Sequence, residues 1–350
     1  MAEAKIIVTG GAGFIGSAVV WRLNELGCDD ILVVDRMDET DKWKNLAPLR
    51  FADYIDADDF LDDIGDLKHA EAIFHLGACS STTERDSDYM LRNNFQYTKD
   101  LAEFALENDI RFIYASSAAT YGDGSAGMAD GTEALDNLRP LNVYGYSKHL
   151  FDQYAARNGY FDRIVGLKYF NVFGPNENHK GDMRSLVNKA FDQIKETGKI
   201  KLFKSHNPEY ADGEFGRDFV YVKDAVDMTL FFWDAGAVTN VRSGDSRALT
   251  DVRATDKRAT DTRGGLFNVG SGRMSTWNEL ADAVFDAFSL PRNVEFIDMP
   301  EHLRERYQYE TLADLTRIRS TGYAAETTPL AAAVEDYVQD YLIPGRHLGD

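Results

Sequence analysis

The first half of the chain alternates short apolar runs with amphipathic segments. The runs are KIIVTG (5–10), ILVVD (31–35), EAIFHLGA (71–78), RFIYASS (111–117) and RIVGLKYFNVFG (163–174). Runs of this length, rich in Ile, Val and Phe, are typical of strands buried on both faces of a parallel sheet. With a helix-like segment between successive runs, the pattern predicts an α/β fold built on a doubly wound, Rossmann-type parallel sheet.

The pattern loosens in the second half. Residues 217–233 predict one more strand and helix, and 264–270 predict another strand. Between them, residues 236–264 consist mainly of Ala, Thr, Asp and Arg and have almost no large apolar side chains. Such a segment cannot bury enough surface to offset its ordering entropy. We therefore expect 236–264 to be a low-complexity surface insertion, which is more often a tolerated insertion than a partner-binding element.

A glycine-rich turn follows the first predicted strand. In VTGGAGFIGS, Gly10, Gly13 and Gly16 are spaced three apart, between a strand and a helix. Glycines there permit a tight turn and a close backbone approach, so that a pyrophosphate can lie at the helix N-terminus. Asp35 ends the second strand, where a carboxylate would meet the adenosine ribose. The turn therefore predicts a dinucleotide site, and the nearby Arg36 and Lys42 favour NADP, with NAD as the alternative.

These elements give a domain hypothesis. Residues 1–171, completed by about 218–235 and 265–275, are expected to form an NAD(P)-binding Rossmann domain. Residues 172–217 and 276–350 are expected to form a smaller, interleaved α/β lobe that binds the substrate.

A second cluster of candidate residues lies in LNVYGYSKHL (141–150). On a helix, residues four apart share a face, so Tyr144 and Lys148 should point into one site and Tyr146 elsewhere. An ammonium beside a phenol favours the phenolate, so we expect Lys148 to lower the pKa of Tyr144 from its usual value of about 10. Ser116 and Ser117, at the end of an earlier strand, can present a hydroxyl to the same site.

Composition argues against several other classes. With 58 acidic and 38 basic residues, the net charge of −20 is unlike that of a nucleic-acid-binding protein. The two cysteines, Cys28 and Cys79, suit neither a disulfide framework nor a metal site. We find no secretory leader, and no apolar run approaches the roughly 18 residues of a membrane helix. We expect a cytoplasmic protein without a metal or a membrane partner.

Several of these motifs together resemble a known family. TGGAGFIG, SSAATYG and the Tyr-x-x-x-Lys spacing resemble the extended short-chain dehydrogenase/reductase superfamily of nucleotide-sugar enzymes. Within it, GACSSTTE (77–84), PLNVYGYSK (140–148), HKGDM (179–183) and RDFVYV (217–222) are similar to the ADP-L-glycero-D-manno-heptose 6-epimerase family of lipopolysaccharide biosynthesis. The resemblance extends from about Lys5 to the C-terminal helices and excludes the insertion.

The resemblance implies an isomerase that inverts C6 of an ADP-linked heptose by transient oxidation to a ketone and re-reduction. One tightly bound NADP, or NAD, per subunit would serve both steps. Because hydride leaves one face of the carbon and returns to the other, two proton-handling groups are implied, matching Tyr144 and Lys180. Lys148 would tune Tyr144 and hold the nicotinamide ribose, and Ser117 would hydrogen-bond the reacting oxygen. The family forms homo-oligomers, here expected to be a pentamer.

Site residues are carried over position by position. The expected cofactor-binding residues are Gly10, Gly13, Phe14, Ile15, Gly16, Asp35, Arg36, Lys42, Leu76, Gly77, Ala78, Cys79, Ser80, Asn93, Tyr144, Lys148, Val172 and Lys180. The expected substrate-binding residues are Ser117, Asn171, Asp182, Lys189, Phe203, Lys204, Ser205, His206, Arg217 and Tyr307. Arginine suits the diphosphate because its planar fork binds phosphate oxygens in pairs.

The chain departs from the family pattern at several of these positions. Leu76 replaces a glutamate, Ala57 replaces a lysine that helps to hold NADP, and FKSH (203–206) replaces FEGS. Asp182 replaces a serine and Lys189 a histidine. The substrate-facing positions thus change more than the catalytic ones. An epimerase or dehydratase for another nucleotide sugar stays an alternative, as does a non-catalytic NAD(P)-binding regulatory protein.

Overall fold

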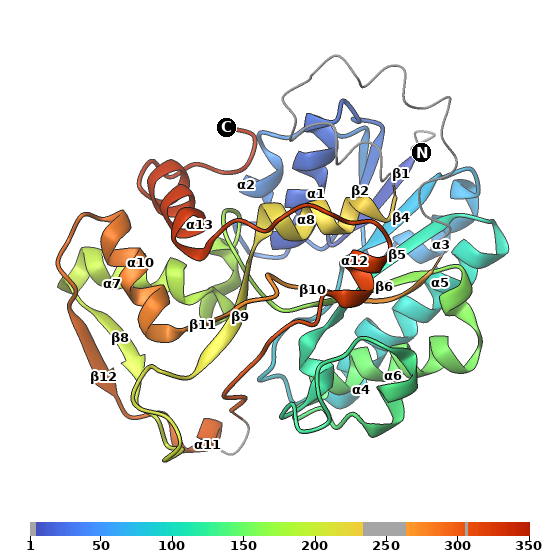
Figure 1. Cartoon of the computed structure of the whole chain (residues 1–350). Helices are drawn as coiled ribbons and strands as arrows, with labels where there is room; N and C mark the ends of the chain where they lie inside the picture. The colour runs from blue at the N-terminus through green and yellow to red at the C-terminus, as the bar shows by residue number, and fades with distance from the viewer. Residues whose placement is uncertain (1–4, 234–263, 305–306) are drawn as a thin grey trace.

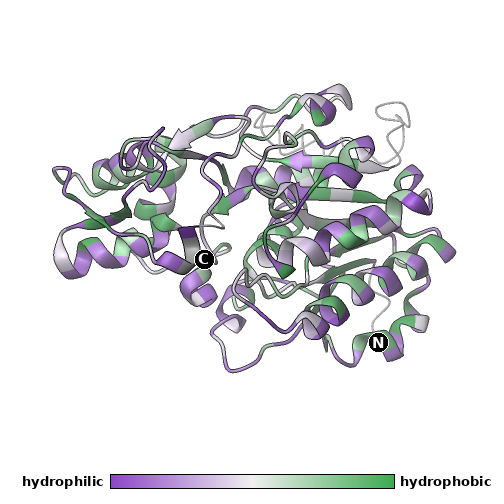
Figure 2. Ribbon diagram, turned by 90° about the horizontal axis from the view of Figure 1, so that it is seen from below, coloured by the Kyte–Doolittle hydropathy of each residue, from purple (hydrophilic) through white to green (hydrophobic). Residues whose placement is uncertain are grey.

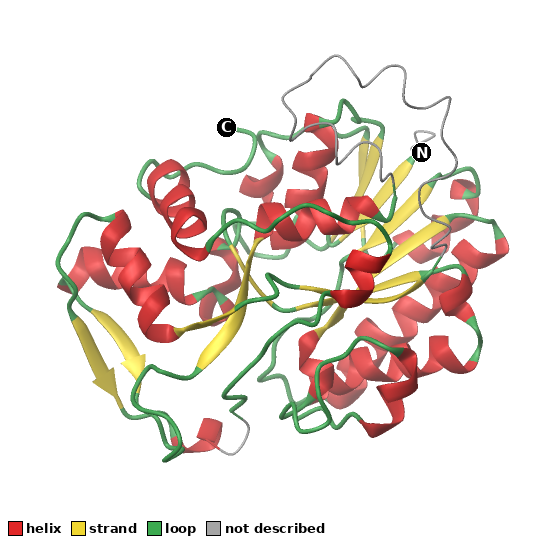
Figure 3. Ribbon diagram, viewed as in Figure 1, coloured by secondary structure: helices red, strands yellow, loops and turns green. Residues whose placement is uncertain are grey.

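A parallel sheet of seven strands forms the larger part of the protein (Figures 1 and 3). The computed structural model describes residues 5–233, 264–304 and 307–350, so the predicted insertion lies outside the described residues apart from Gly264. The strand order is β10-β6-β5-β4-β1-β2-β3, and every neighbouring pair is parallel. The strands are β1 (Ile6–Thr9), β2 (Ile31–Asp35), β3 (Asp53–Asp56), β4 (Ala72–His75), β5 (Arg111–Ser117), β6 (Val165–Tyr169) and β10 (Gly265–Val269).

Both faces of this sheet are covered by helices. Ile6 and Val8 pack in one apolar cluster with residues of α1 (Phe14–Glu25) and α8 (Val222–Phe231). Ile7 packs in the opposite cluster with residues of α5 (Tyr97–Glu107) and α6 (Val143–Arg157). Successive strand residues point to opposite faces, so a sheet covered on both sides needs continuous apolar runs. The predicted doubly wound fold is confirmed.

Shorter helical segments connect these elements. In the larger part they are α2 (Trp43–Leu46), α3 (Phe60–Asp63), α4 (Ser87–Met90), the 3-10 segments at Ile64–Leu67, Ala118–Tyr121, Thr132–Asn137 and Tyr160–Asp162, and a π-helical turn at Leu91–Gln96. In Figure 2 the outer helices alternate hydrophilic and hydrophobic stretches, as expected where one side packs on the sheet.

A second group of elements lies beside the carboxyl ends of the large sheet's strands (Figure 1). β9 (Gly216–Tyr221) is the central strand of a three-stranded sheet, parallel to β7 (Asn171–Phe173) and antiparallel to β11 (Met274–Thr276). β8 (Ile200–Phe203) pairs in parallel with β12 (Val294–Ile297). The helical segments here are Asn178–Met183 (3-10), α7 (Leu186–Thr197), α10 (Trp277–Ala287), α11 (Glu301–Arg304), α13 (Leu330–Asp336) and the π-helical turn Tyr337–Leu342, whereas α12 (Thr316–Ser320) packs on β10 of the large sheet.

The chain crosses between the two groups several times. β7 follows β6 after one residue, and α8 returns from the small sheet to pack against α1. β10 then joins the edge of the large sheet beside β6. Residues far apart in sequence therefore meet where the two groups face each other. In the described part of the chain, no helix is long and apolar enough to cross a membrane.

Candidate functional site

A cavity of about 1540 Å³ lies between the strand ends of the large sheet and the smaller group of elements. Every residue expected to bind the cofactor lines this cavity. Of the residues expected to bind substrate, Ser117, Asn171, Asp182, Lys189, Phe203, Arg217 and Tyr307 line it, whereas Lys204, Ser205 and His206 do not. Open α/β sheets bind ligands at this edge.

The glycine turn after β1 leaves no room for side chains. Gly10 has φ +67°, and a Cβ there would lie 2.6 Å from the Gly77 backbone nitrogen. A Cβ at Gly16 would lie 2.0 Å from the Gly10 carbonyl oxygen. Gly13 is the N-cap of α1, and no side chain caps the backbone N–H groups at that helix start. The turn therefore fits a dinucleotide pyrophosphate, which free N–H groups and the helix dipole both favour.

Asp35, at the end of β2, hydrogen-bonds the backbone of this glycine turn. One carboxylate oxygen, Oδ2, accepts hydrogen bonds from the backbone nitrogens of Ala12 (2.9 Å) and Gly13 (3.1 Å). The other, Oδ1, is 3.0 Å from the Lys42 ammonium. Asp35 is buried but lines the cavity, so it is placed both to shape the turn and to meet a ribose.

Arg36 sits beside the same part of the cavity. Its guanidinium pairs with the Asp58 carboxylate and donates from Nη1 to the Asn93 side-chain oxygen at 2.8 Å. The hydrogen bond to Asp58 is the main reason that the pKa of Arg36 is raised. Ala57, where the resembled family has a lysine, lines the cavity next to Asp58. This end of the cavity thus combines the cations Arg36 and Lys42 with several carboxylates.

Helix α6 carries the tyrosine–lysine pair. Asn142 caps it by accepting a hydrogen bond from the Gly145 backbone nitrogen at 2.8 Å. The helical spacing places Tyr144 and Lys148 in the cavity and leaves Tyr146 46% exposed. Lys148 is buried and donates from Nζ to the Ala115 carbonyl at 2.7 Å. The two predicted partners therefore share one site.

The expected effect on the Tyr144 pKa is wrong in this structure. Burial raises the pKa of Tyr144, a hydrogen bond with the Ser117 side chain partly offsets this, and Lys148 is not among the causes. Burial in turn lowers the pKa of Lys148 to about 8, with Asp152 acting in the opposite direction. The ammonium is engaged by a backbone carbonyl, so desolvation of the phenol decides the direction.

Ser116 and Ser117 have different partners. Ser116 donates to Asp152 Oδ2 at 2.8 Å, and the same carboxylate pairs with the buried Lys168 ammonium at 3.0 Å. Both serines line the cavity, and Ser117 Oγ accepts a hydrogen bond from the Ala119 backbone nitrogen at 3.1 Å. Of the two serines, Ser117 is the one that hydrogen-bonds Tyr144, and Ser116 hydrogen-bonds Asp152 of α6.

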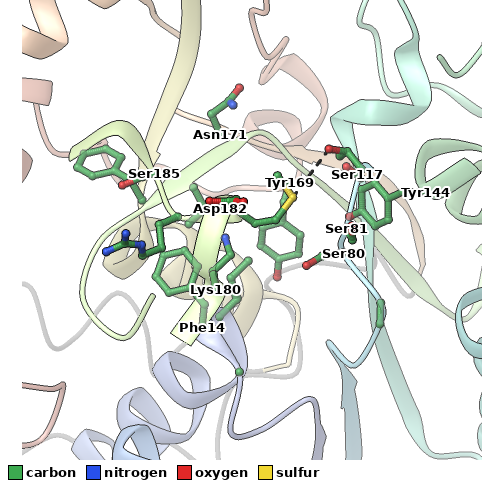
Figure 4. Close-up of a pocket in the computed structure, with 18 of the residues that line it drawn as sticks. Phe14, Ser80, Ser81, Ser117, Tyr144, Tyr169, Asn171, Lys180, Asp182 and Ser185 are labelled. Atoms are coloured by element: carbon green, nitrogen blue, oxygen red, sulfur yellow. Dashed lines mark hydrogen bonds between the residues drawn. The ribbon is translucent and has the colours of Figure 1, made fainter. Parts of the chain in front are cut away.

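Lys180 enters the cavity from a different element. It lies in the 3-10 segment Asn178–Met183, and its Nζ is 4.9 Å from the centroid of the Phe14 ring. Figure 4 shows it on the opposite side of the cavity from Tyr144 and Ser117. Burial lowers the pKa of Lys180, while the Glu177 carboxylate acts in the opposite direction and Lys189 adds to the lowering. A lysine in this setting releases a proton more readily than an exposed one.

Three further residues that were predicted to bind substrate also line the cavity: Asp182, Lys189 and Asn171. Lys189, on α7, donates from Nζ to the Asp182 backbone carbonyl at 2.6 Å. Asn171, on β7, also lines the cavity, and its side chain lies apart from Lys180 and Tyr144 in Figure 4. Asp182, Lys189 and Asn171 therefore line the same cavity as Tyr144 and Lys180.

The far end of the cavity contains a buried arginine among aromatic rings. Arg217, on β9, is only 7% exposed, and its guanidinium lies 5.0 Å from the centre of the Tyr307 ring. It donates from Nη1 to the Gly216 carbonyl at 3.2 Å, also interacts with the Tyr307 hydroxyl, and has no ion pair with a carboxylate of the described residues. Burial lowers the pKa of Arg217. A buried cation without a carboxylate partner is costly, and an anionic ligand would compensate it.

The segment 203–206 only partly faces the cavity. Lys204 pairs with Asp298 at 3.3 Å on the surface, and His206 Nε2 accepts a hydrogen bond from the Met299 backbone nitrogen at 3.3 Å. Ser205 Oγ donates to the Asn207 carbonyl at 2.8 Å. Phe203, at the end of β8, is the member of the segment that lines the cavity.

Several lining residues were not expected from the sequence. Phe215 and Phe219 flank Arg217 at two-residue spacing, and strand alternation would have placed all three on one face. Trp277, the first residue of α10, could not be predicted as a lining residue, because its neighbours in the cavity lie on β9, far away in the sequence. His75, by contrast, does not line the cavity and is buried between the hydroxyls of Thr9 and Thr98.

The described residues contain no group of three or more His, Cys, Asp or Glu that could hold a metal ion. What they do contain is a Rossmann sheet with a glycine turn and a tyrosine–lysine pair at one cavity, the arrangement of an NAD(P)-dependent enzyme. A model of the NAD dependent epimerase/dehydratase family matches residues 6–241.

Comparison with relatives of known name narrows the family assignment further. The chain is 48% identical over 339 residues to ADP-L-glycero-D-manno-heptose-6-epimerase of Nitratidesulfovibrio vulgaris (strain DP4), covering 96% of this chain and 97% of that protein. A protein of the same name from Fusobacterium nucleatum is 44% identical over 349 residues, covering 96% and 98%. The chain belongs to the NAD dependent epimerase/dehydratase family and, within it, to the ADP-L-glycero-D-manno-heptose-6-epimerases.

Solved structures agree with this assignment. The crystal structure of Helicobacter pylori ADP-L-glycero-D-manno-heptose-6-epimerase has a TM-score of 0.74 at 26% identity, covering 97% of each chain. A UDP-N-acetylglucosamine 4-epimerase from Methanobrevibacter ruminantium shares the fold, with a TM-score of 0.76 at 22% identity and coverage of 99% and 100%.

Proposed function

We propose that the protein is a nucleotide-sugar epimerase that inverts C6 of ADP-glycero-manno-heptose by transient oxidation to a ketone and re-reduction. The observation that carries the proposal is that Tyr144 and Lys180 enter one cavity from different elements, on opposite sides, beside a turn that fits a dinucleotide. A bound nicotinamide would supply reversible hydride transfer at C6.

The side chains supply the proton steps and the positioning. Tyr144 Oη and Lys180 Nζ each hold or accept the proton of the C6 hydroxyl, one for each orientation of that oxygen. Ser117 donates a hydrogen bond to the same oxygen from the end of β5. Lys148, whose pKa burial lowers to about 8, would hold the nicotinamide ribose next to Tyr144.

Arg217 is the proposed anchor for the nucleotide diphosphate. Its guanidinium is buried in the cavity and has no ion pair with a described carboxylate. Bidentate binding of phosphate oxygens would satisfy it, and the rings of Phe215 and Tyr307 would exclude water around it.

For the cofactor we propose NADP, with NAD as the alternative. Arg36 and Lys42 are the two cations at the adenosine end of the cavity, and either can meet a 2′-phosphate. The carboxylate of Asp58 disfavours NADP, because it pairs with Arg36 and would repel a 2′-phosphate. One tightly bound cofactor per subunit is expected.

We further propose a cytoplasmic homo-oligomer, because the resembled family forms pentamers. Light scattering on the purified protein measures the subunit number, and a monomer would contradict the proposal.

The test of the function uses the purified protein and each C6 epimer of ADP-heptose, without added cofactor. Interconversion is expected, and Tyr144→Phe and Lys180→Met should each lower its rate by at least 100-fold, the order of magnitude of one acid–base group. Tyr146→Phe and Lys195→Met are the matched controls, because both residues are exposed and lie outside the cavity. Wild-type activity in Lys180→Met would contradict the two-group mechanism.

A further inference from the structure

Trp277 lies beside Arg217 because of strand pairing. β11 runs antiparallel to β9, with Ser275 opposite Arg217, and the ladder continues with the Trp277 backbone nitrogen donating to the Phe215 carbonyl at 3.3 Å. Residues opposite each other in such a ladder share a face of the sheet. Trp277 is thus a diagonal neighbour of Arg217, on the face that lines the cavity.

The position of the indole is fixed from several sides. Thr276 forms a capping box with Glu279 at the start of α10, so the backbone of Trp277 is held in the first helical turn. The ring packs edge to face on Phe219, with centroids 5.2 Å apart. The indole therefore has little freedom to turn away from the cavity.

The indole N–H is buried but has no hydrogen-bond partner among the described residues. A contact with Trp277 lowers the pKa of the Tyr307 phenol, although burial keeps this pKa above its usual value, so the Tyr307 side chain is a polar neighbour of the indole. An unsatisfied buried donor costs about 1–3 kcal/mol, so an acceptor is expected when the site is in use. The Arg217 guanidinium stacks on the same Tyr307 ring, so the indole N–H and this buried cation lie beside one side chain.

We propose that Trp277 is a substrate-binding residue whose indole N–H donates to an oxygen of the nucleotide diphosphate held by Arg217. The ligand class is a nucleoside diphosphate, since the neighbouring donor is a cation and Trp277 can donate but not accept. This inference rests on the proposed nucleotide-sugar substrate and adds a second donor to its diphosphate site.

The test compares ADP with adenosine as probes, measured by calorimetry on protein saturated with NADP so that the dinucleotide part of the cavity is filled. Trp277→Phe keeps an aromatic ring against Phe219 and removes only the donor. We expect ADP to bind 5- to 20-fold more weakly to Trp277→Phe than to wild type, with adenosine affinity unchanged. Trp43→Phe, at a residue 54% exposed on α2, is the control and should match wild type.

Two results would overturn the proposal. Unchanged ADP affinity in Trp277→Phe would show that the N–H makes no contact with the diphosphate. An equal loss of ADP and adenosine affinity would show that the ring only packs. Neither result depends on epimerisation, so the proposal and the proposed function can fail separately.

Discussion

We expect the choice between NADP and NAD to depend most on Arg36. It is paired with Asp58, but the two side chains are 35% and 68% exposed. Exposed ion pairs contribute only about 0–1 kcal/mol, so a 2′-phosphate can displace Asp58 at little cost. Lys42 is less available, because it is already bound to the Asp35 carboxylate and the Arg36 carbonyl.

Substitution of Arg36 should therefore separate the two cofactors. Arg36→Ala is expected to weaken NADP binding about 10- to 100-fold relative to NAD, the range of a charge-assisted hydrogen bond. Asp58→Asn should favour NADP a few-fold by freeing the guanidinium. The measurement is the ratio of the two dissociation constants, with Asp41→Asn, outside the cavity, as the control. An equal loss for NADP and NAD in Arg36→Ala would mean that Arg36 does not meet the 2′-phosphate.

The role of single residues was predictable from the sequence only where local geometry decides it. Tyr144 and Lys148 share a helix face, so their spacing placed both in the cavity. The pKa of Tyr144 could not be predicted, because it depends on burial by other elements and on where the Lys148 ammonium points. The same holds for Lys204 and His206, which turn to partners near β12 and away from the cavity.

The segment that carries Lys180 is held by buried polar groups. Asn176 has φ +78°, donates to Ser17 Oγ at 3.0 Å and accepts from the Leu348 backbone nitrogen at 3.0 Å. Glu177 is fully buried and accepts hydrogen bonds from the backbone and hydroxyl of Ser185, both at 2.6 Å. These bonds tie the segment to α1, α7 and the C-terminal residues, and so fix where Lys180 enters the cavity.

Substitutions of Asn176 can separate what its backbone conformation and its side-chain hydrogen bonds each contribute to the free energy of unfolding. Asn176→Gly and Asn176→Ala both lose the side-chain hydrogen bonds, but glycine tolerates the positive φ and alanine does not. We expect Asn176→Ala to lower the free energy of unfolding by about 1–2 kcal/mol more than Asn176→Gly, the usual cost of left-handed backbone. Urea unfolding measures both. Equal losses would show that the left-handed backbone carries no penalty here.

Elements far apart in sequence meet in the cavity, and this limited what the sequence could predict. The fold followed from the apolar runs, because each strand of the large sheet is buried on both faces. The presence of Trp277 in the cavity could not be predicted from the sequence, because it depends on the pairing of β11 with β9 across more than 50 residues of chain. The approach of Lys180 to the Phe14 ring likewise depends on the whole fold.

The central claim for the whole molecule is that C6 is inverted within one cavity that contains both proton-handling groups, Tyr144 and Lys180. The decisive measurement is proton NMR of ADP-heptose converted by the protein in D₂O. The C6 hydrogen of the product should be fully retained, because it is carried between faces within the site and never exchanges with water. Deuterium at C6 of the product would contradict the proposed reaction and point to proton abstraction from carbon.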